Sequence, residues 1–280
     1  MNPTALFSDI ADFRKYCDGL QADTEYRQLL PSIRSTASAI SQIIGKRTLL
    51  AISELDDSCE GLDLLKTAIA TGTLYRYHIF DSVKKNGSDA SLYKYQYEEI
   101  KEHHICAHWI AMDSLLSWLD ENPSVGAYNE TKTYLNRQEL PVKSAEEFDY
   151  YYGIDRSAYF FSKVQFLMRS VWQHKIKPMV SGLDIDAELQ DMINRCLCYQ
   201  VVAEAVMKFD VTELPRSIRY DYNHEYSKGS SMQSRDKLYG DLMSQVAAWN
   251  ESIENLVQIQ KGATAINMNT NNEDDKFYMA

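Results

Sequence analysis

SLYKYQYEEIKEHHICAHWIAMDSLLSWLDE, residues 91–121, contains neither glycine nor proline and repeats one set of side chains at helical spacing. Intervals of three and four residues place side chains on one face of an α-helix. The segment therefore predicts a long amphipathic helix. The residues of its stripe are Tyr93, Tyr97, Ile100, His104, Ala107, Ala111, Leu115 and Trp118.

Start and stop signals divide the rest of the chain into further helices, with Asn122-Pro123 and Pro178 as stop signals. Gly72 falls on one predicted stripe and predicts a close crossing of two helices. Breakers are few, with 11 glycines and 6 prolines in 280 residues, and residues 217–222 (SIRYDY) are the best strand candidate. The sequence therefore predicts an all-α fold, with helices over 9–17, 24–44, 62–83, 91–121, 144–152, 155–177, 186–209 and 233–261.

The pattern of residues 91–121 recurs at 238–259, which suggests that one unit occurs twice. DIADFRKYCDG (9–19) aligns with SAEEFDYYYGI (144–154), LLPSIRSTASAISQ (29–42) with FFSKVQFLMRSVWQ (160–173), and HICAHWIAMDSLLSWL (104–119) with SQVAAWNESIENLVQI (244–259). The matched segments occur in the same order in both halves of the chain. The offsets between matched residues change only across loops, where insertions are tolerated. We predict two tandem, similar helical-bundle units with a long central helix in each: 1–125 and 144–262, with a linker at 126–143 and a flexible tail at 263–280.

Composition excludes several classes of function. The formal net charge of −11 is opposite to the basic face that nucleic acid requires, so a nucleic-acid partner is not expected. The chain holds no run of about 20 apolar residues, and its first residues lack the features of a signal peptide, so no membrane association is expected. The five cysteines form no CxxC pair and are read as reduced thiols, which predicts a cytoplasmic protein.

His104 and His108 are four residues apart on the long predicted helix, a spacing that allows two imidazoles to share a metal ion, and Glu99 is a further ligand candidate. The Glu-x-x-His pattern of di-iron bundles is absent. We therefore read the histidines as partly buried packing residues and assign neither metal nor cofactor. Because no GxSxG, phosphate-binding or dinucleotide-binding motif occurs either, no catalytic residue is assigned and an enzyme is not predicted.

A second unusual segment is RSIRYDYNHEY, residues 216–226, which mixes arginine with tyrosine. This composition is typical of protein interfaces and of grooves that bind single-stranded nucleic acid. Three interpretations remain open: an ordinary long loop, an arm that contacts a protein, and a nucleic-acid contact. The tyrosine run 150–152 is read as a half-buried core edge. The candidate partner-contact residues of the arm are Arg216, Arg219, Tyr220, Tyr222 and Tyr226.

The segments LFSDIADFRKYC, LLPSIRSTASAISQIIGK and KSAEEFDYYYGIDRS, with the helices after them, resemble an uncharacterised family encoded in phages and prophages of gut bacteria. Each half of the chain is also similar to the helical head-to-tail connector (neck) proteins of tailed phages, which assemble as rings beneath the portal. The resemblance implies a role in virion assembly without catalysis. This chain departs from it by being two units long, which leaves the stoichiometry of a ring open.

Together these observations predict a non-catalytic structural protein, a phage-derived connector component that contacts copies of itself or portal- and tail-type proteins. A homo-oligomer, in the cytoplasm or as part of a virion, is the expected state. Two alternatives stay open. One is a metal-binding helical-bundle enzyme that uses the His104 and His108 cluster. The other is a cytosolic adaptor that binds a partner between the two units.

Overall fold

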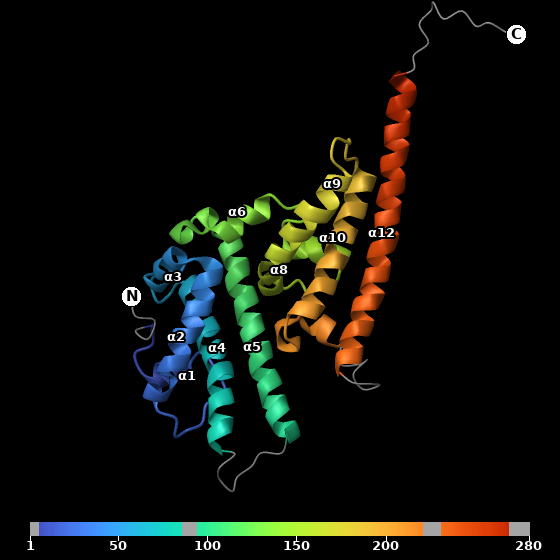
Figure 1. Cartoon of the computed structure of the whole chain (residues 1–280). Helices are drawn as coiled ribbons and strands as arrows, with labels where there is room; N and C mark the ends of the chain where they lie inside the picture. The colour runs from blue at the N-terminus through green and yellow to red at the C-terminus, as the bar shows by residue number, and fades with distance from the viewer. Residues whose placement is uncertain (1–5, 86–93, 221–230, 269–280) are drawn as a thin grey trace, which may run out of the picture. The chain divides into compact units, whose positions relative to one another are not determined.

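The computed structural model describes residues 6–85, 94–220 and 231–268 of the chain (Figure 1). In these ranges every element of secondary structure is helical and no residue forms a strand, which confirms the all-α prediction. Residues 217–220 of the strand candidate are helical, because Pro215 is followed by a turn whose Arg219 amide donates to the Pro215 carbonyl. None of the helices in the described part combines the length and the apolar character that a bilayer crossing requires.

The chain divides into two compact units. Unit 1 comprises residues 1–139 and 157–163, and unit 2 comprises residues 140–156 and 164–280. Each unit is described by itself below. The helices of unit 1 are α1 (Ile10–Arg14), α2 (Tyr26–Ile44), α3 (Lys46–Ser53), α4 (Glu60–Lys85), α5 (Lys94–Glu121), the 3-10 turn η2 (Val125–Glu130) and α6 (Lys132–Gln138).

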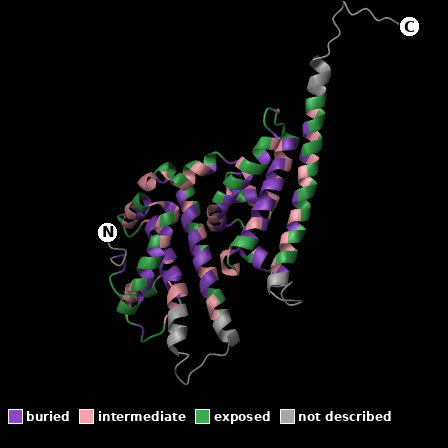
Figure 2. Cartoon of the chain, in the orientation of Figure 1, coloured by how far each residue is buried: buried purple, intermediate pink, exposed green. Residues whose placement is uncertain are grey.

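Helix α4 is the central helix of unit 1, because it packs against both α2 and α5. The sequence had suggested α5 for this role. Leu65, Ile69 and Ala70 on α4 are fully buried, and so are Ile33 on α2 and Leu115 on α5 (Figure 2). A helix that is apolar around much of its circumference is typical of the centre of a bundle. The strong single stripe of α5 is therefore the mark of an outer helix.

The predicted linker at 126–143 holds η2 and α6, both of which belong to unit 1. Gly126 has φ of 54°, and a Cβ there would lie 2.5 Å from the Thr48 Cα, so η2 lies directly on α3. The Thr48 hydroxyl donates to the Gly126 carbonyl over 3.3 Å. Arg137 on α6 is buried and donates to the Asp120 carboxylate at 2.8 Å. These contacts explain why a polar segment without clear periodicity is ordered.

The helices of unit 2 are α7 (Ala145–Tyr151), α8 (Ala158–Val171, whose first residues belong to unit 1), the π-helical turn η3 (Trp172–Ile176), α9 (Lys177–Met179), α10 (Ala187–Lys208), the 3-10 turn η4 (Val211–Glu213) and α12 (Ser231–Met268). Helix α10 packs against both α7 and α12 and is the central helix of this unit. Its side chains are buried on nearly every face between Ile193 and Val206 (Figure 2).

Two predicted helix ends in unit 2 differ from the structure. The helix that contains α8 does not stop before Pro178, because the π-helical turn η3 leads into α9, where Pro178 occupies a first-turn position that tolerates its missing N–H. Helix α12 extends to Met268, so 263–268 of the predicted tail are helical, and 269–280 lie outside the described residues. Hydrogen bonds from Arg235 to the Phe209 carbonyl and from Gln260 to the Asp184 carbonyl join α12 to the two ends of α10.

Candidate functional site

The two predicted ligand histidines lie on α5, and both are buried. His108 faces α4, where a Cβ on Gly72 would lie 2.7 Å from its Cε1 atom. His104 packs against Gly19 and against the ring of His78, with ring centroids 5.5 Å apart. Glu99, the third ligand candidate, is exposed. In the part of the chain that the structure describes, no group of three or more His, Cys, Asp or Glu side chains is arranged to hold a metal ion.

Burial also keeps both imidazoles neutral. It is the largest cause that lowers the pKa of His104 to about 4, and the neighbouring rings of His78 and His103 act in the same direction. Burial likewise lowers the pKa of His108 to about 4, aided by the positive charge of Arg76 and opposed by a hydrogen bond to the Ala68 backbone. Both rings are therefore uncharged at neutral pH and act as packing groups of the α4–α5 pair.

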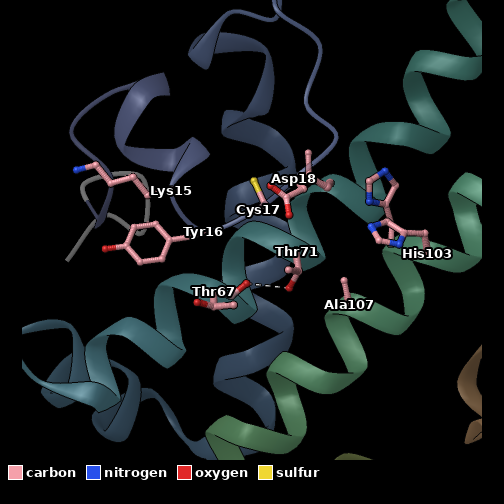
Figure 3. Close-up of a pocket in the computed structure, with 10 residues that line it drawn as sticks. Lys15, Tyr16, Cys17, Asp18, Thr67, Thr71, His103 and Ala107 are labelled. Atoms are coloured by element: carbon pink, nitrogen blue, oxygen red, sulfur yellow. Dashed lines mark hydrogen bonds between the residues drawn. The ribbon is translucent and has the colours of Figure 1, made fainter.

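Beside His104, a pocket of about 340 Å³ opens within unit 1 (Figure 3). Three segments form its walls: the end of α1 with the turn after it, one face of α4, and one face of α5. The volume lies near the lower end of the roughly 300–1,000 Å³ range of small-ligand pockets. The lining residues are Lys15, Tyr16, Cys17, Asp18, Thr67, Thr71, Leu74, His103, His104 and Ala107.

The turn after α1 is held in place by hydrogen bonds from the Arg14 side chain to backbone carbonyls of the turn. The Arg14 guanidinium donates to the carbonyls of Gln21 and Ala22 at 2.9 and 3.0 Å, which folds the turn back on the helix. Gly19 has φ of 86°, a conformation that suits glycine, and a Cβ there would lie 3.2 Å from the His104 Cε1 atom. The first wall of the pocket is therefore a tight, defined turn seated on α5.

The pocket offers binding groups and lacks an activated nucleophile. Burial raises the pKa of the Cys17 thiol to about 12, with a smaller contribution from Asp18, so the sulfur is protonated at neutral pH. The hydroxyls of Thr67 and Thr71 donate to carbonyls one turn earlier in α4, at 2.8 Å each. In Figure 3, Cys17, Asp18 and Thr71 lie between Tyr16 on one side and His103 on the other.

The arginine and tyrosine segment at 216–226 is only partly described. Arg216 and Tyr220 are exposed on the short helix over 216–220, whereas Arg219 is only 6% exposed and is not available as a surface contact. Tyr222 and Tyr226 lie outside the described residues.

On unit 2, the structure assembles a cluster that the sequence did not indicate, here called the aromatic–arginine cluster: Tyr150, Tyr151, Arg195 and Trp249. The Arg195 guanidinium lies 5.7 Å from the ring centroids of both Tyr151 and Trp249. Tyr150 packs edge-on against Tyr151, with centroids 5.0 Å apart, and is itself 72% exposed. The cluster joins α7, α10 and α12.

Hydrogen bonds from α10 hold the side chains of the cluster in place. The Arg195 Nε atom donates to the Asp191 carboxylate at 2.7 Å, and the Asn194 amide donates to the Tyr151 hydroxyl at 3.1 Å. Both donors lie on α10. The run of three tyrosines at 150–152 is only a weak signal for this arrangement, because the arginine and the tryptophan come from helices 44 and 98 residues further on (195−151 and 249−151). Comparison of the chain with protein-family models, with characterised proteins and with solved structures finds no match.

Proposed function

We propose that this protein is a non-catalytic assembly protein that associates with copies of itself, and that the aromatic–arginine cluster of unit 2 is its contact surface. The observation that carries the proposal is the cluster's chemistry and rigidity. Tyrosine, tryptophan and arginine are the residue types that contribute most binding energy at protein interfaces. Tyr150 is the exposed member, and the others hold it on a helical scaffold.

The rigidity of the cluster favours binding. Association costs free energy for each side chain that it immobilises, about 0.5–1.5 kcal/mol for a side chain with many rotamers. Arg195 is already held by Asp191 and by two aromatic rings, so little of this cost remains. About a third of its side chain is still accessible (30%), which leaves its remaining N–H groups within reach of a partner's acceptors.

A tandem duplication agrees with this role, since two similar units in one chain suit a building block that contacts like surfaces. The helices of the two units follow in the same order: α1, α2, α4 and α5 in the first, and α7, α8, α10 and α12 in the second. The burial pattern of α4 over 64–74 matches that of α10 over 192–202 position by position. The exception is Thr71, which is buried, against Tyr199, which is half-buried. These parallels support an internal duplication with an offset of 128 residues between the central helices.

Burial also changes the alignment of the last helices. With the offset of 140 residues that pairs Trp109 with Trp249, buried positions of α5 fall on exposed positions of α12. With an offset of 138, the buried apolar residues of α12 all fall on buried residues of α5: Leu242 on His104, Val246 on His108, Ile253 on Leu115 and Val257 on Leu119. With this offset the two tryptophans fall on different faces of the two helices.

The head-to-tail connector role remains part of the proposal and rests on the resemblance of the sequence pattern alone. It adds a ring-shaped assembly and portal- or tail-type partners to the self-association proposed above. The metal-binding enzyme has no favouring observation in the described residues, where Glu99 is exposed and the two histidines pack against different neighbours. The adaptor alternative concerns the junction of the two units and stays a prediction.

Sedimentation velocity over a concentration series tests the proposal. We expect the unaltered chain to form a larger species as concentration rises, and Tyr150→Ala or Arg195→Ala to weaken association at least about tenfold, the effect of losing one interface hot spot. Leu135→Ala is the matched control, because it removes a 53% exposed apolar side chain from unit 1. A chain that stays monomeric at high concentration, or association that Tyr150→Ala leaves unchanged, contradicts the proposal.

A further inference from the structure

The pocket of unit 1 lies where the two proposed repeats differ in side-chain size. Between residues 64–74 of α4 and 192–202 of α10, burial differs at one pair, Thr71 and Tyr199, and Thr71 is a pocket residue. The same offset of 128 residues pairs Thr67 with Arg195. The small hydroxyls of unit 1 thus stand in places where unit 2 carries a phenol ring and a guanidinium.

The wall formed by the turn after α1 also has a smaller side chain in unit 1 than its counterpart in unit 2. Aligning α1 with α7 at an offset of 135 residues pairs Cys17 with Tyr152. In unit 2, the rings of Tyr152 and Tyr199 pack edge to face, with centroids 5.1 Å apart and planes at 90°. The corresponding residues of unit 1 are a thiol and a threonine, both of which line the pocket. The fold of unit 2 therefore accommodates two phenol rings in a place that unit 1 leaves open.

We propose that the pocket of unit 1 binds the phenol ring of a tyrosine side chain supplied by a protein partner. The inference rests on the duplication included in the proposed function, and it adds a second contact site of stated chemistry. The partner's tyrosine takes the place that Tyr199 occupies in unit 2.

The lining of the pocket suits a phenol. Leu74 and Ala107 give it an apolar floor, and Tyr16 and His103 supply ring edges for the edge-to-face contacts that aromatic pairs prefer. Asp18 is exposed beside the opening, so its carboxylate is an acceptor for a phenol hydroxyl. The Tyr16 ring is held from two sides, by the cation of Lys66 at 5.5 Å from its centroid and by the Phe7 ring at 5.8 Å between centroids.

NMR spectra of the full chain titrated with N-acetyl-L-tyrosinamide test the inference. We expect saturable shifts of the amides of Cys17, Gly19, Thr71 and His104 with a Kd of about 1 mM, the affinity that a fragment of this size reaches. N-acetyl-L-leucinamide is the control and should shift the same amides less than a tenth as far at the same concentration. Absence of saturable shifts around the pocket, or equal shifts with the leucine compound, overturns the inference.

Two variants localise the binding. Thr71→Tyr places in unit 1 the ring that unit 2 carries and should weaken binding of the tyrosine compound at least tenfold, whereas Thr71→Val keeps the pocket open and should bind within about twofold of the unaltered chain. If Thr71→Tyr does not fold, Thr67→Arg fills the pocket from the neighbouring turn and should have the same effect. Unchanged binding in a folded filling variant contradicts the site.

This titration separates the inference from the proposed function, because the tyrosine compound requires no assembly of the chain. A chain that binds the compound at the pocket but sediments as a monomer retains the site and loses the self-association proposal. A chain that associates through Tyr150 but does not bind the compound retains the proposed function and loses the site. Both measurements use the same full-length protein.

Discussion

Gly72 on α4 and His108 on α5 are in contact at a close crossing of these two helices. A Cβ on Gly72 would lie 2.7 Å from the His108 Cε1 atom and also 2.7 Å from the Thr36 methyl group. Atoms do not approach this closely without a shift, and both neighbours are buried. The crossing therefore depends on the absence of a side chain at position 72.

Gly72→Ala should lower the free energy of unfolding by about 1 kcal/mol, because overpacking of about 1–3 kcal/mol outweighs the better helix propensity of alanine, about 1 kcal/mol. Urea denaturation measures the change. Gly240→Ala on α12 is the matched control. A Cβ there meets nothing within 4 Å, so this substitution should stabilise the protein by roughly 0.5–1 kcal/mol. Equal effects of the two substitutions would remove the argument for a close crossing.

Acid should destabilise unit 1 through its buried histidines. The folded pKa of His108, about 4, lies below the ordinary histidine pKa of 6.5, so the unfolded chain binds more protons between these values. The contribution of this group is fully present above about pH 6.5 and is lost as the pH falls toward 4, up to about 3 kcal/mol. His104 acts in the same direction.

Urea denaturation between pH 7.5 and pH 4.5 checks this dependence, with His108→Gln as the comparison. Glutamine does not titrate, and its amide is a donor for the Ala68 carbonyl, so the variant should lose less stability than the unaltered protein over the same range. Identical profiles for the two chains would show that His108 does not contribute to the acid sensitivity.

The ion pair that fixes α6 should contribute more stability than the surface ion pairs do. Asp120→Asn leaves the buried Arg137 guanidinium without its carboxylate at 2.8 Å. Since Asp120 is itself about a third exposed, we expect a loss of about 2 kcal/mol, less than the 3–5 kcal/mol of a fully buried pair. Lys208→Gln breaks a more exposed pair with Glu204 and should cost less than about 0.5 kcal/mol. Thermal and urea denaturation of both variants measure the difference.

A helix such as α2 was predictable from the sequence because it has one wide apolar stripe and a clear stop signal. The sequence predicted α2 over 24–44, and the helix spans Tyr26–Ile44. The ordered segment with η2 and α6 was not predictable in this way. Its order depends on Gly126 lying against Thr48 and on Arg137 reaching Asp120, contacts between residues that are 78 and 17 positions apart. Such contacts leave no local pattern.

The candidate sites show the same distinction. Gly72 was predictable as a close-contact residue because it interrupts an apolar stripe, although its partner, His108, was not. The aromatic–arginine cluster escaped sequence reasoning because Tyr151, Arg195 and Trp249 come from three helices, and α10 carries no single apolar face against which Arg195 stands out. The pocket escaped it because small residues such as Cys17 and Thr71 become informative only beside their counterparts in unit 2.

Site-specific photocrosslinking tests the proposed assembly most directly. A benzophenone side chain is placed at Tyr150 in the aromatic–arginine cluster, and in a second sample at Ile110, which is 67% exposed on unit 1. Irradiation at a concentration where the chain associates should give covalent dimers from position 150 at several times the yield from position 110. Dimers in equal yield from both positions, or from position 110 alone, would contradict the claim that unit 2 carries the contact surface.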